Sequence, residues 1–243
     1  MSKTCLKDMT ALVTGGSRGI GRAVARKLAD HGVNLMLVGR NLKKLEAVQR
    51  DLSTKNVKVF FCVEDLADAQ APARIIRETV ERLGGLDILI NNAAVGMVAP
   101  LTETSVEQWD RIMAVNARAP FLLSKEAIPY LRKSRCSSII NISSVVGYKG
   151  YINQGAYTAS KHALMGMTKV LAQEVYKDNI RVHVISPGGV DTEMLYDMRP
   201  DLKPSEVISP DEIADIVMFL LTHRGNGVID EINIRRVSNS PWK

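Results

Sequence analysis

Residues 10–21 read TALVTGGSRGIG, an apolar run followed at once by a glycine-rich loop. Residues 10–13 predict a buried strand, and residues 20–30 have the periodicity of a helix that ends at His31-Gly32. Glycines between a strand and a helix permit a tight turn and a close approach of the backbone to a pyrophosphate. The helix N-terminus then presents unpaired N–H groups to the anion. The segment therefore predicts a dinucleotide-binding loop rather than an ordinary turn.

Outward from this loop, apolar runs and helical segments alternate along the chain. Strands are expected at 10–13, 33–38, 57–62, 86–90, 138–142, 180–185 and 229–234, and helices at 20–30, 42–52, 72–83, 105–132, 156–176 and 210–221, with a deformation at Pro120. Continuous apolar strands alternating with helices are typical of a parallel sheet covered on both faces. No repeat or linker divides the chain. The predicted fold is α/β: a single domain, residues 1–243, of the Rossmann-type doubly wound class, with a mostly parallel seven-stranded sheet and helices on both faces.

The composition argues against several classes of protein. Apolar residues make up 46% and charged residues 24%, as in an ordinary globular domain. The net charge is +6, but the basic residues are dispersed and aromatic residues are only 5%, so nucleic-acid binding is not expected. No signal peptide and no membrane-length apolar run is evident. The cysteines and histidines lack the spacing of disulfides or metal sites, so we expect no metal and a reducing, cytoplasmic location.

The end of the second predicted strand indicates which dinucleotide binds. An NAD site usually carries an acidic residue there, which binds the ribose hydroxyls. This chain has Val38-Gly39-Arg40-Asn41 instead. Arg40 would attract a 2′-phosphate that a carboxylate would repel, and Arg18 adds a second cation within the loop. The predicted cofactor is NADP(H), although each arginine is also compatible with a solvent-facing charge.

A second motif, Tyr157-Thr-Ala-Ser-Lys161, places a phenol and an ammonium on one face of the helix expected at 156–176. A nearby cation favours the phenolate and lowers the pKa of a tyrosine from about 10 toward neutrality. A tyrosine tuned in this way can exchange a proton with a carbonyl or alcohol oxygen. Together with the glycine loop and the earlier serine Ser144, the pair indicates a redox enzyme that moves a hydride.

These motifs resemble those of the short-chain dehydrogenase/reductase family, over roughly residues 8–222. The resemblance rests on motifs in the family's order: Thr-Gly-x-x-x-Gly-x-Gly at 14–21, Asp65-Leu66, Asn91-Asn92-Ala93-Ala94, Asn116, Ser143-Ser144, Tyr157-x-x-x-Lys161 and Pro187-Gly188. It implies a catalytic set of Asn116, Ser144, Tyr157 and Lys161, with Ser143 as the alternative to Ser144.

The resemblance also implies a role for each member of this set. Tyr157 would be the general acid in reduction, and Ser144 would hydrogen-bond the substrate oxygen. Lys161 would bind the nicotinamide ribose and lower the pKa of the tyrosine. Asn116 would hold a helix backbone and a water that relays protons to Lys161.

The same resemblance implies where the cofactor binds. Asp65 and Leu66 would contact the adenine. Asn91 would form the floor of the site or simply tie two strands together, and Thr192 would reach the nicotinamide carboxamide or pyrophosphate, or cap a helix. The full set predicted to bind NADP(H) is Gly15, Ser17, Arg18, Gly19, Ile20, Gly21, Arg40, Asp65, Leu66, Asn92, Ala93, Tyr157, Lys161, Pro187, Gly188, Val190 and Thr192.

The sequence leaves the substrate open. The loop after Gly96 and the segment 193–209, predicted either as a mobile lid or as a surface helix and loop, should set specificity. An apolar pocket is expected from Met97, Val98, Tyr148, Tyr151, Asn153, Gln154, Met194 and Leu195. It would suit a 3-oxoacyl thioester, a small carbonyl compound or a sugar-like ketone. The predicted activity is an NADP(H)-dependent oxidoreductase that interconverts a carbonyl compound and its alcohol. The alternative is a non-catalytic NADP(H)-binding sensor or scaffold on the same fold.

The resemblance extends to assembly. The helices at 105–132 and 156–176 resemble those that pair in relatives, which implies a homodimer or homotetramer. The chain departs from the family pattern at Ala94, where a glycine is usual, and at residues 230–236, which replace a glycine-rich segment. The second departure affects the sheet edge through which many relatives form a tetramer.

Overall fold

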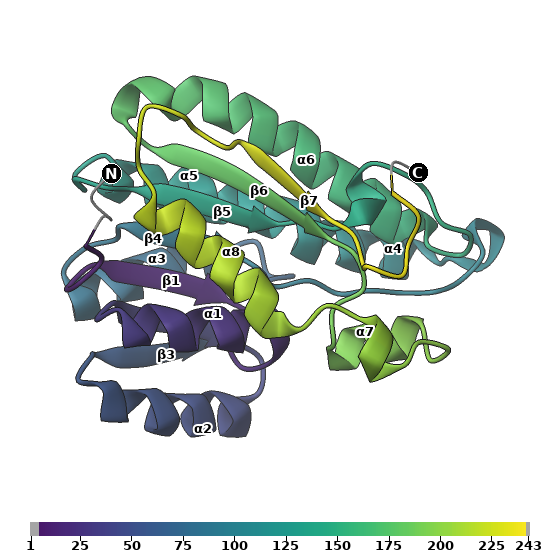
Figure 1. Ribbon diagram of the computed structural model, residues 1–243, viewed down its shortest axis with the longest axis horizontal. Helices are drawn as coiled ribbons and strands as arrows, with labels where there is room; N and C mark the ends of the chain where they lie inside the picture. Colours follow the sequence, from purple (N-terminus) through teal and green to yellow (C-terminus); the bar gives the residue numbers. More distant parts are fainter. Residues whose placement is uncertain (1–4, 242–243) are drawn as a thin grey trace.

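The computed structural model describes residues 5–241, which form one seven-stranded sheet with helices on both sides (Figure 1). The strand order is β3-β2-β1-β4-β5-β6-β7, and each neighbouring pair is parallel. The strands are β1 (Thr10–Thr14), β2 (Asn34–Gly39), β3 (Val59–Val63), β4 (Ile88–Asn91), β5 (Ser138–Ile142), β6 (Arg181–Pro187) and β7 (Glu231–Ile234). The predicted α/β class is confirmed. Residues 1–4 and 242–243 of the predicted domain lie outside the described residues.

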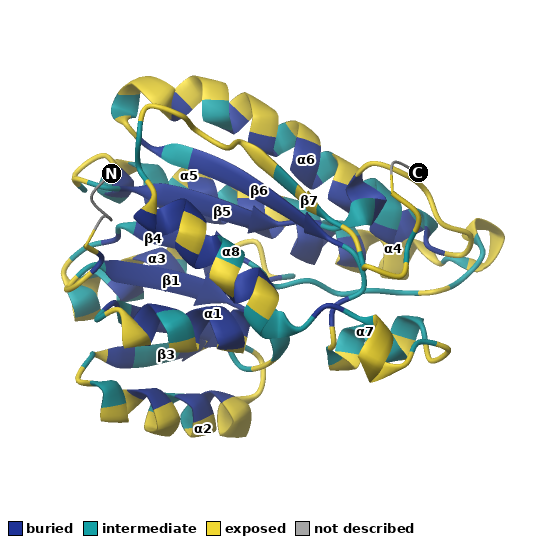
Figure 2. Ribbon diagram, in the orientation of Figure 1, coloured by how far each residue is buried: buried dark blue, intermediate teal, exposed yellow. Residues whose placement is uncertain are grey.

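Successive side chains of a strand point to opposite faces, so the sheet separates two cores. In β1, Val13 packs into one core, which includes helices α1, α2 and α8, and Leu12 packs into the other, which includes α3, α5 and α6. These helices are α1 (Gly19–Asp30), α2 (Leu42–Leu52), α3 (Ala71–Leu83), α5 (Ala119–Leu131), α6 (Gly155–Val175) and α8 (Pro210–Thr222). Figure 2 shows buried strands between helices with exposed outer faces. Burial on both faces explains the continuous apolar runs of the strand sequences.

The strand order reverses at β1, which lies between β2 and β4. Such a reversal opens a crevice outside the carboxyl ends of the strands. Thr14 and Asn92, which end β1 and follow β4, join the two sides of this crevice. The Asn92 side-chain amide donates to the Thr14 carbonyl (2.9 Å), and the backbone N–H groups of Asn92 and Ala93 both donate to Thr14 Oγ1 (3.0 Å each).

The helix predicted at 105–132 is interrupted. Helix α4 (Val106–Met113) and helix α5 are joined by a π-helical turn at Ala114–Arg118. The predicted deformation is therefore present, but it lies in the turn before Pro120, which itself sits in the first turn of α5. Proline lacks an N–H and its ring crowds the preceding turn, which loosens the helical ladder there.

The structure also bears on the predictions for the final strand and for residues 193–209. The final strand is shorter than the predicted 229–234, because β7 begins only at Glu231, on the edge of the sheet. Within 193–209 the chain forms helix α7 (Glu193–Met198) and a 3₁₀ turn at Pro204–Glu206. The segment thus has the form of a surface helix and loop, and α7 stands apart from the sheet at its carboxyl end (Figure 1).

The glycine loop is as tight as its sequence predicts. Gly15 and Gly19 have φ angles of 66° and 51°, a region that side chains disfavour. Gly21 has a different constraint, because a Cβ there would lie 2.3 Å from the Gly15 carbonyl oxygen and 2.5 Å from Asn92 Nδ2. Gly21 therefore allows the loop to fold back on the start of α1.

We predict that Gly21→Ala destabilises the protein by about 3 kcal/mol, because the methyl group meets backbone that cannot move aside. The measurement is the free energy of unfolding in urea. The matched control is Gly166→Ala in α6, where a Cβ meets no atom within 4 Å and helix propensity favours alanine by about 1 kcal/mol. Equal effects of the two substitutions would contradict the packing described for Gly21.

Candidate active site

One large cleft, with a volume of about 1190 Å³, opens at the carboxyl ends of the strands. Its lining extends from the glycine loop and Arg40 to the end of β5, helix α6 and the C-terminal tail. The predicted site residues that line it are Gly15, Ser17, Arg18, Gly19, Ile20, Arg40, Asp65, Leu66, Asn92, Ala93, Ser144, Tyr157, Lys161, Pro187, Gly188, Val190 and Thr192. Residues far apart in the sequence thus meet in one cavity.

Two predicted site residues, Gly21 and Asn116, do not line the cleft. Gly21 lies beneath the loop, where its lack of a side chain matters. Asn116 is fully buried in the π-helical turn. Its side chain accepts from the Val95 N–H and donates to the Val95 carbonyl (2.8 Å each), and it donates to Ser160 Oγ (3.0 Å). The side chain therefore binds the backbone of the loop after β4 and a side chain of α6, not the helix backbone that was expected.

The predicted catalytic side chains of α6 meet Ser144 where the cleft is lined by the end of β5. Ser144 follows β5, and its hydroxyl is hydrogen-bonded to the Tyr157 side chain. Lys161 is 2% exposed, and its Nζ donates to the Ile142 carbonyl (2.9 Å) and lies 5.8 Å from the centre of the Tyr157 ring. Ser143 also lines the cleft, but its buried hydroxyl has no hydrogen-bond partner among the described residues. The contact with Tyr157 distinguishes Ser144 from Ser143.

The protonation of this group differs from the expectation that Lys161 lowers the pKa of Tyr157. Burial raises the pKa of Tyr157 to about 12, and the hydrogen bond with Ser144 opposes this only in part. Burial also lowers the pKa of Lys161 to about 8. Desolvation disfavours the charged form of both groups and is the larger effect here. Tyr157 is therefore a protonated phenol at neutral pH.

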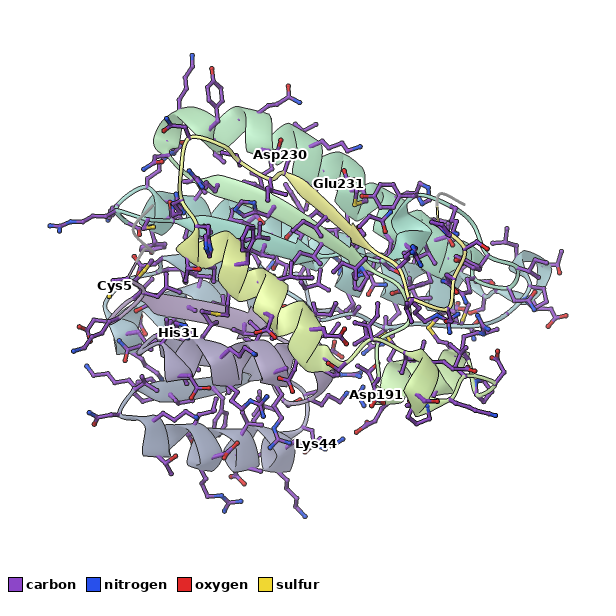
Figure 3. All side chains as sticks on the ribbon, viewed as in Figure 1. Cys5, His31, Lys44, Asp191, Asp230 and Glu231 are labelled. Atoms are coloured by element: carbon purple, nitrogen blue, oxygen red, sulfur yellow. The ribbon has the colours of Figure 1, made fainter. Side chains whose placement is uncertain are left out.

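The opposite end of the cleft gathers cations. Arg40 is exposed at the end of β2, and Lys44 lies in the first turn of α2, as labelled in Figure 3. Glu193 at the start of α7 forms ion pairs with Lys44 (2.8 Å) and with Arg18 of the glycine loop. These contacts hold the pKa of Glu193 below its usual range. Arg18 and Lys44 are thus partly neutralised by α7.

Lys44 was not among the predicted site residues, although a signal was present. Lys43 and Lys44 occupy the first turn of a helix that has no acidic residue there. The helix dipole disfavours cations at that position, so a pair of lysines beside Arg40 indicates a site for an anion.

Several residues predicted to contact the cofactor form hydrogen bonds or ion pairs within the protein. Asn91 donates to Asn141 Oδ1 (2.8 Å), which ties β4 to β5. Thr192 caps α7 by accepting from the Leu195 N–H (3.3 Å). Asp65 accepts from the Ala67 N–H and pairs with Arg111 (2.9 Å). Burial raises the pKa of Asp65, but these two hydrogen bonds and the positive charges of Arg111 and Arg40 outweigh it and leave the pKa below its ordinary value.

The predicted substrate pocket is only partly correct. Tyr151, Gln154, Met194 and Leu195 line the cleft, whereas Met97, Val98, Tyr148 and Asn153 do not. The Tyr148 hydroxyl instead donates to the carboxylate of Glu231, and the Asn153 carbonyl accepts from the Ala99 N–H (2.8 Å).

Other residues that line the cleft were not predicted individually. They are Lys149, Tyr196, Met198, Arg199, Leu202, Arg236, Ser238, Asn239 and Ser240. Tyr196, Met198, Arg199 and Leu202 belong to the segment 193–209 that was predicted to set specificity. Lys149 follows β5, and the other four belong to the C-terminal tail, which local sequence patterns did not connect with the cleft.

Comparison with known proteins identifies the family. The family model described as short chain dehydrogenase matches residues 9–203, which is most of the chain. The chain belongs to the short-chain dehydrogenase family. Its members are oxidoreductases, so the protein is an oxidoreductase of this family.

Individual members are similar over nearly the whole chain. The 3-oxoacyl-[acyl-carrier-protein] reductase FabG of Aquifex aeolicus is 32% identical, over 93% of this chain and 95% of the relative. The structure of an alcohol dehydrogenase from Thermococcus sibiricus, complexed with 5-hydroxy-NADP, matches with a TM-score of 0.89 and 29% identity, covering 97% of this chain and 99% of the other. A metagenomic short-chain oxidoreductase in complex with NADP matches with a TM-score of 0.84 and 34% identity, covering 96% and 100%.

Two negative findings concern residues 5–241. Within this range no cluster of histidine, cysteine or acidic side chains has the arrangement of a metal site. No helix of the same range is long and apolar enough to cross a membrane.

We predict that Lys161→Met stabilises this dehydrogenase at neutral pH. The lowered pKa of Lys161 corresponds to a burial cost of about 3 kcal/mol, and the lost hydrogen bond to Ile142 offsets about 1 kcal/mol of the gain. The measurement is the free energy of unfolding in urea for both proteins.

The pH dependence of this difference has a definite sign. The pKa of Lys161 is about 8 in the folded protein and 10.5 in the unfolded chain. Between these two pH values the unfolded chain holds a proton that the folded chain has lost, so the stability of the wild type rises with pH. The advantage of Lys161→Met should therefore shrink above pH 8. A variant that is less stable than the wild type at pH 7 would contradict the prediction.

Proposed function

We propose that the protein is an NADP(H)-dependent oxidoreductase that interconverts a carbonyl compound and its alcohol by hydride transfer. One observation carries the proposal. A single cleft holds a glycine loop with adjacent cations at one end and a hydrogen-bonded Ser144–Tyr157 pair, with the buried Lys161, at the other. A protein that only binds the nucleotide has no need for a buried ammonium beside a buried phenol, because burial of both is costly.

The residues of the chain fit the cofactor that the family implies. The N-terminus of α1 and the glycine loop would hold the pyrophosphate, and Arg40, with Lys44 and Arg18, would hold a 2′-phosphate. Asp65 and Leu66 would contact the adenine, and Lys161 the nicotinamide ribose. A bound reduced nicotinamide would supply the hydride.

Tyr157 would act as the general acid in the reducing direction. Because its pKa lies near 12, the phenol retains its proton at neutral pH and can donate it to a carbonyl oxygen that becomes negative. Ser144 would donate a hydrogen bond to the same oxygen, and such a fixed donor stabilises the charge that develops in the transition state. Both hydroxyls are held in advance by the hydrogen bond between them.

Lys161 and Asn116 would support this pair. The Lys161 ammonium, fixed by the Ile142 carbonyl, would supply a positive charge beside the phenol, because a pKa of about 8 leaves it mostly protonated at neutral pH. Asn116 would position α6, since it donates to Ser160, whose hydroxyl donates to the Tyr157 carbonyl (2.7 Å).

The comparisons support two classes of substrate. The similarity to a 3-oxoacyl-[acyl-carrier-protein] reductase supports a 3-oxoacyl thioester among the candidates. The similarity to an alcohol dehydrogenase equally supports a simple carbonyl compound.

We further propose that the chain is a single catalytic domain, residues 1–243, and that residues 193–209 form a lid over its substrate. The ion pairs of Glu193 with Arg18 and Lys44 support this, because they join α7 to the opposite side of the cleft.

We also propose that the protein assembles as a homodimer or homotetramer. Apolar side chains are exposed on the outer faces of α4 and α5, where Val106 is 71% and Phe121 is 48% exposed. A second copy of the chain would cover this surface, which belongs to one of the two helical segments, 105–132 and 156–176, whose pairing the family resemblance implied.

We predict that Tyr157→Phe lowers kcat by about 10² to 10⁴-fold, because the proton donor is lost. NADPH binding, measured by the change in its fluorescence, should be unchanged, since the ring remains. The control is Tyr176→Phe, which removes the same hydroxyl at an exposed position outside the cleft. Undiminished turnover of the Tyr157 variant over a panel of carbonyl substrates would refute the assigned role.

We predict that Arg40→Asp weakens NADPH binding by about 10- to 100-fold and leaves NADH binding within about threefold, because only NADPH carries the 2′-phosphate. Dissociation constants for both nucleotides are the measurement. The control is Arg50→Asp, the same charge change at an exposed position of α2 outside the cleft. Equal weakening of both nucleotides would remove Arg40 from the phosphate site.

A further inference from the structure

The C-terminal tail after β7 lies against the cleft and contributes one arginine to it. Gly188, after β6, donates its N–H to the Ile234 carbonyl (2.7 Å), which attaches the tail to this side of the cleft. The tail then turns, closed by a hydrogen bond from the Asn239 N–H to the Arg236 carbonyl (3.0 Å). Arg235 secures the turn by donating to the carbonyls of residues 236, 237 and 239.

Arg236 is half-buried and lines the cleft, with its side-chain carbons against Gly188 and Gly189. A Cβ on Gly189 would lie 3.5 Å from Arg236 Cδ, an ordinary contact distance, so the arginine stem packs directly against this segment. The guanidinium donates through Nη2 to Asn239 Oδ1 (3.0 Å). This contact orients the guanidinium through one of its three nitrogens.

The position of Arg236 places it at the substrate end. In the sheet order, β6 lies beside β5, the strand that Ser144 follows, and three strand spacings from β1, which precedes the glycine loop. Three spacings correspond to about 14 Å. Because its stem packs against Gly188 and Gly189, which follow β6, Arg236 lies nearer to the strand end that carries Ser144 than to the strand end that carries the glycine loop.

The charge of Arg236 is not matched by an ion pair. Among residues 5–241, no carboxylate lies within ion-pair distance of its guanidinium. The charge of Arg236 acts on the carboxylate of Asp201, but that carboxylate already accepts hydrogen bonds from Nε and Nη2 of Arg199, at 2.7 and 2.6 Å. Arg199 is thus neutralised, whereas Arg236 brings a net positive charge to the cleft.

We propose that Arg236 binds an anionic group, a carboxylate or a phosphate, on the carbonyl substrate. This proposal rests on the proposed oxidoreductase function and narrows its substrate to a ketone or aldehyde with a negatively charged end. A guanidinium that is oriented through one nitrogen can still use its remaining N–H donors on two oxygens of such a group. The substrate oxygen would face Ser144 and Tyr157 while its charged end faces the tail.

The test uses the full-length protein, NADPH and matched pairs of carbonyl substrates. One pair is a keto acid and its methyl ester, over several chain lengths; a second is a keto phosphate monoester and the corresponding alcohol. For the wild type, kcat/KM should be at least about tenfold higher for the charged member of a pair. Preference within the first pair identifies a carboxylate, and preference within the second identifies a phosphate.

Two variants and a control assign this preference to Arg236. Arg236→Gln should lower kcat/KM for the charged member by about 10- to 100-fold and leave the neutral member within about twofold. Arg236→Lys should retain part of the preference, because it keeps the charge but loses the two-oxygen geometry. Arg77→Gln removes the same charge from an exposed position of α3 outside the cleft and should change neither substrate.

The outcomes separate this proposal from the proposed function. Turnover of neutral carbonyls without preference for their charged partners overturns the anion site and leaves the oxidoreductase function intact. An equal loss for both members in Arg236→Gln, or weaker NADPH binding by that variant, also overturns it. If no carbonyl compound oxidises NADPH, the proposed function fails and the anion site fails with it.

Discussion

The arrangement of the whole site depends on the hydrogen bonds between Thr14 and Asn92. They join the end of β1 to the loop after β4 where the strand order reverses, so the crevice has a fixed floor. Asn92 reaches Thr14 only because Gly21 and Gly15 have no side chains in its path. The glycine loop therefore does two things at once: it presents backbone N–H groups to an anion, and it makes room for the contact between neighbouring strands.

A second constraint is the burial of Lys161, which lowers the stability of the protein. Lys161 has a carbonyl for a partner and no carboxylate within ion-pair distance among the described residues. An isolated buried ammonium lowers stability, so its presence beside a buried phenol indicates selection for chemistry rather than for folding. The same burial keeps Tyr157 protonated. Stability and reactivity are opposed at this position, as is common in active sites.

The cleft is electrostatically divided. At one end, Arg18 and Lys44 are linked to α7 by Glu193, while Arg40 stays exposed. At the other end, Arg199 is neutralised by Asp201, and the tail supplies Arg236 without an acidic partner within ion-pair distance. A substrate with a charge at its far end would therefore be oriented as well as bound. The C-terminal tail makes this orientation of the substrate possible, because it carries Arg236.

The sequence by itself determined the α/β class, the seven strands and the glycine loop, because these depend on local periodicity and on backbone freedom at particular glycines. Only the tertiary structure decided that burial would raise the pKa of Tyr157, since desolvation depends on every element packed around α6. Tertiary structure likewise brought Lys44 and Arg236 into the cleft. Arg236 reaches the cleft because the C-terminal tail packs against Gly188 and Gly189, and Lys44 is linked there to Glu193, which follows it by 149 positions. The paired lysines of α2 hint at an anion site, but no local pattern records these contacts between distant segments.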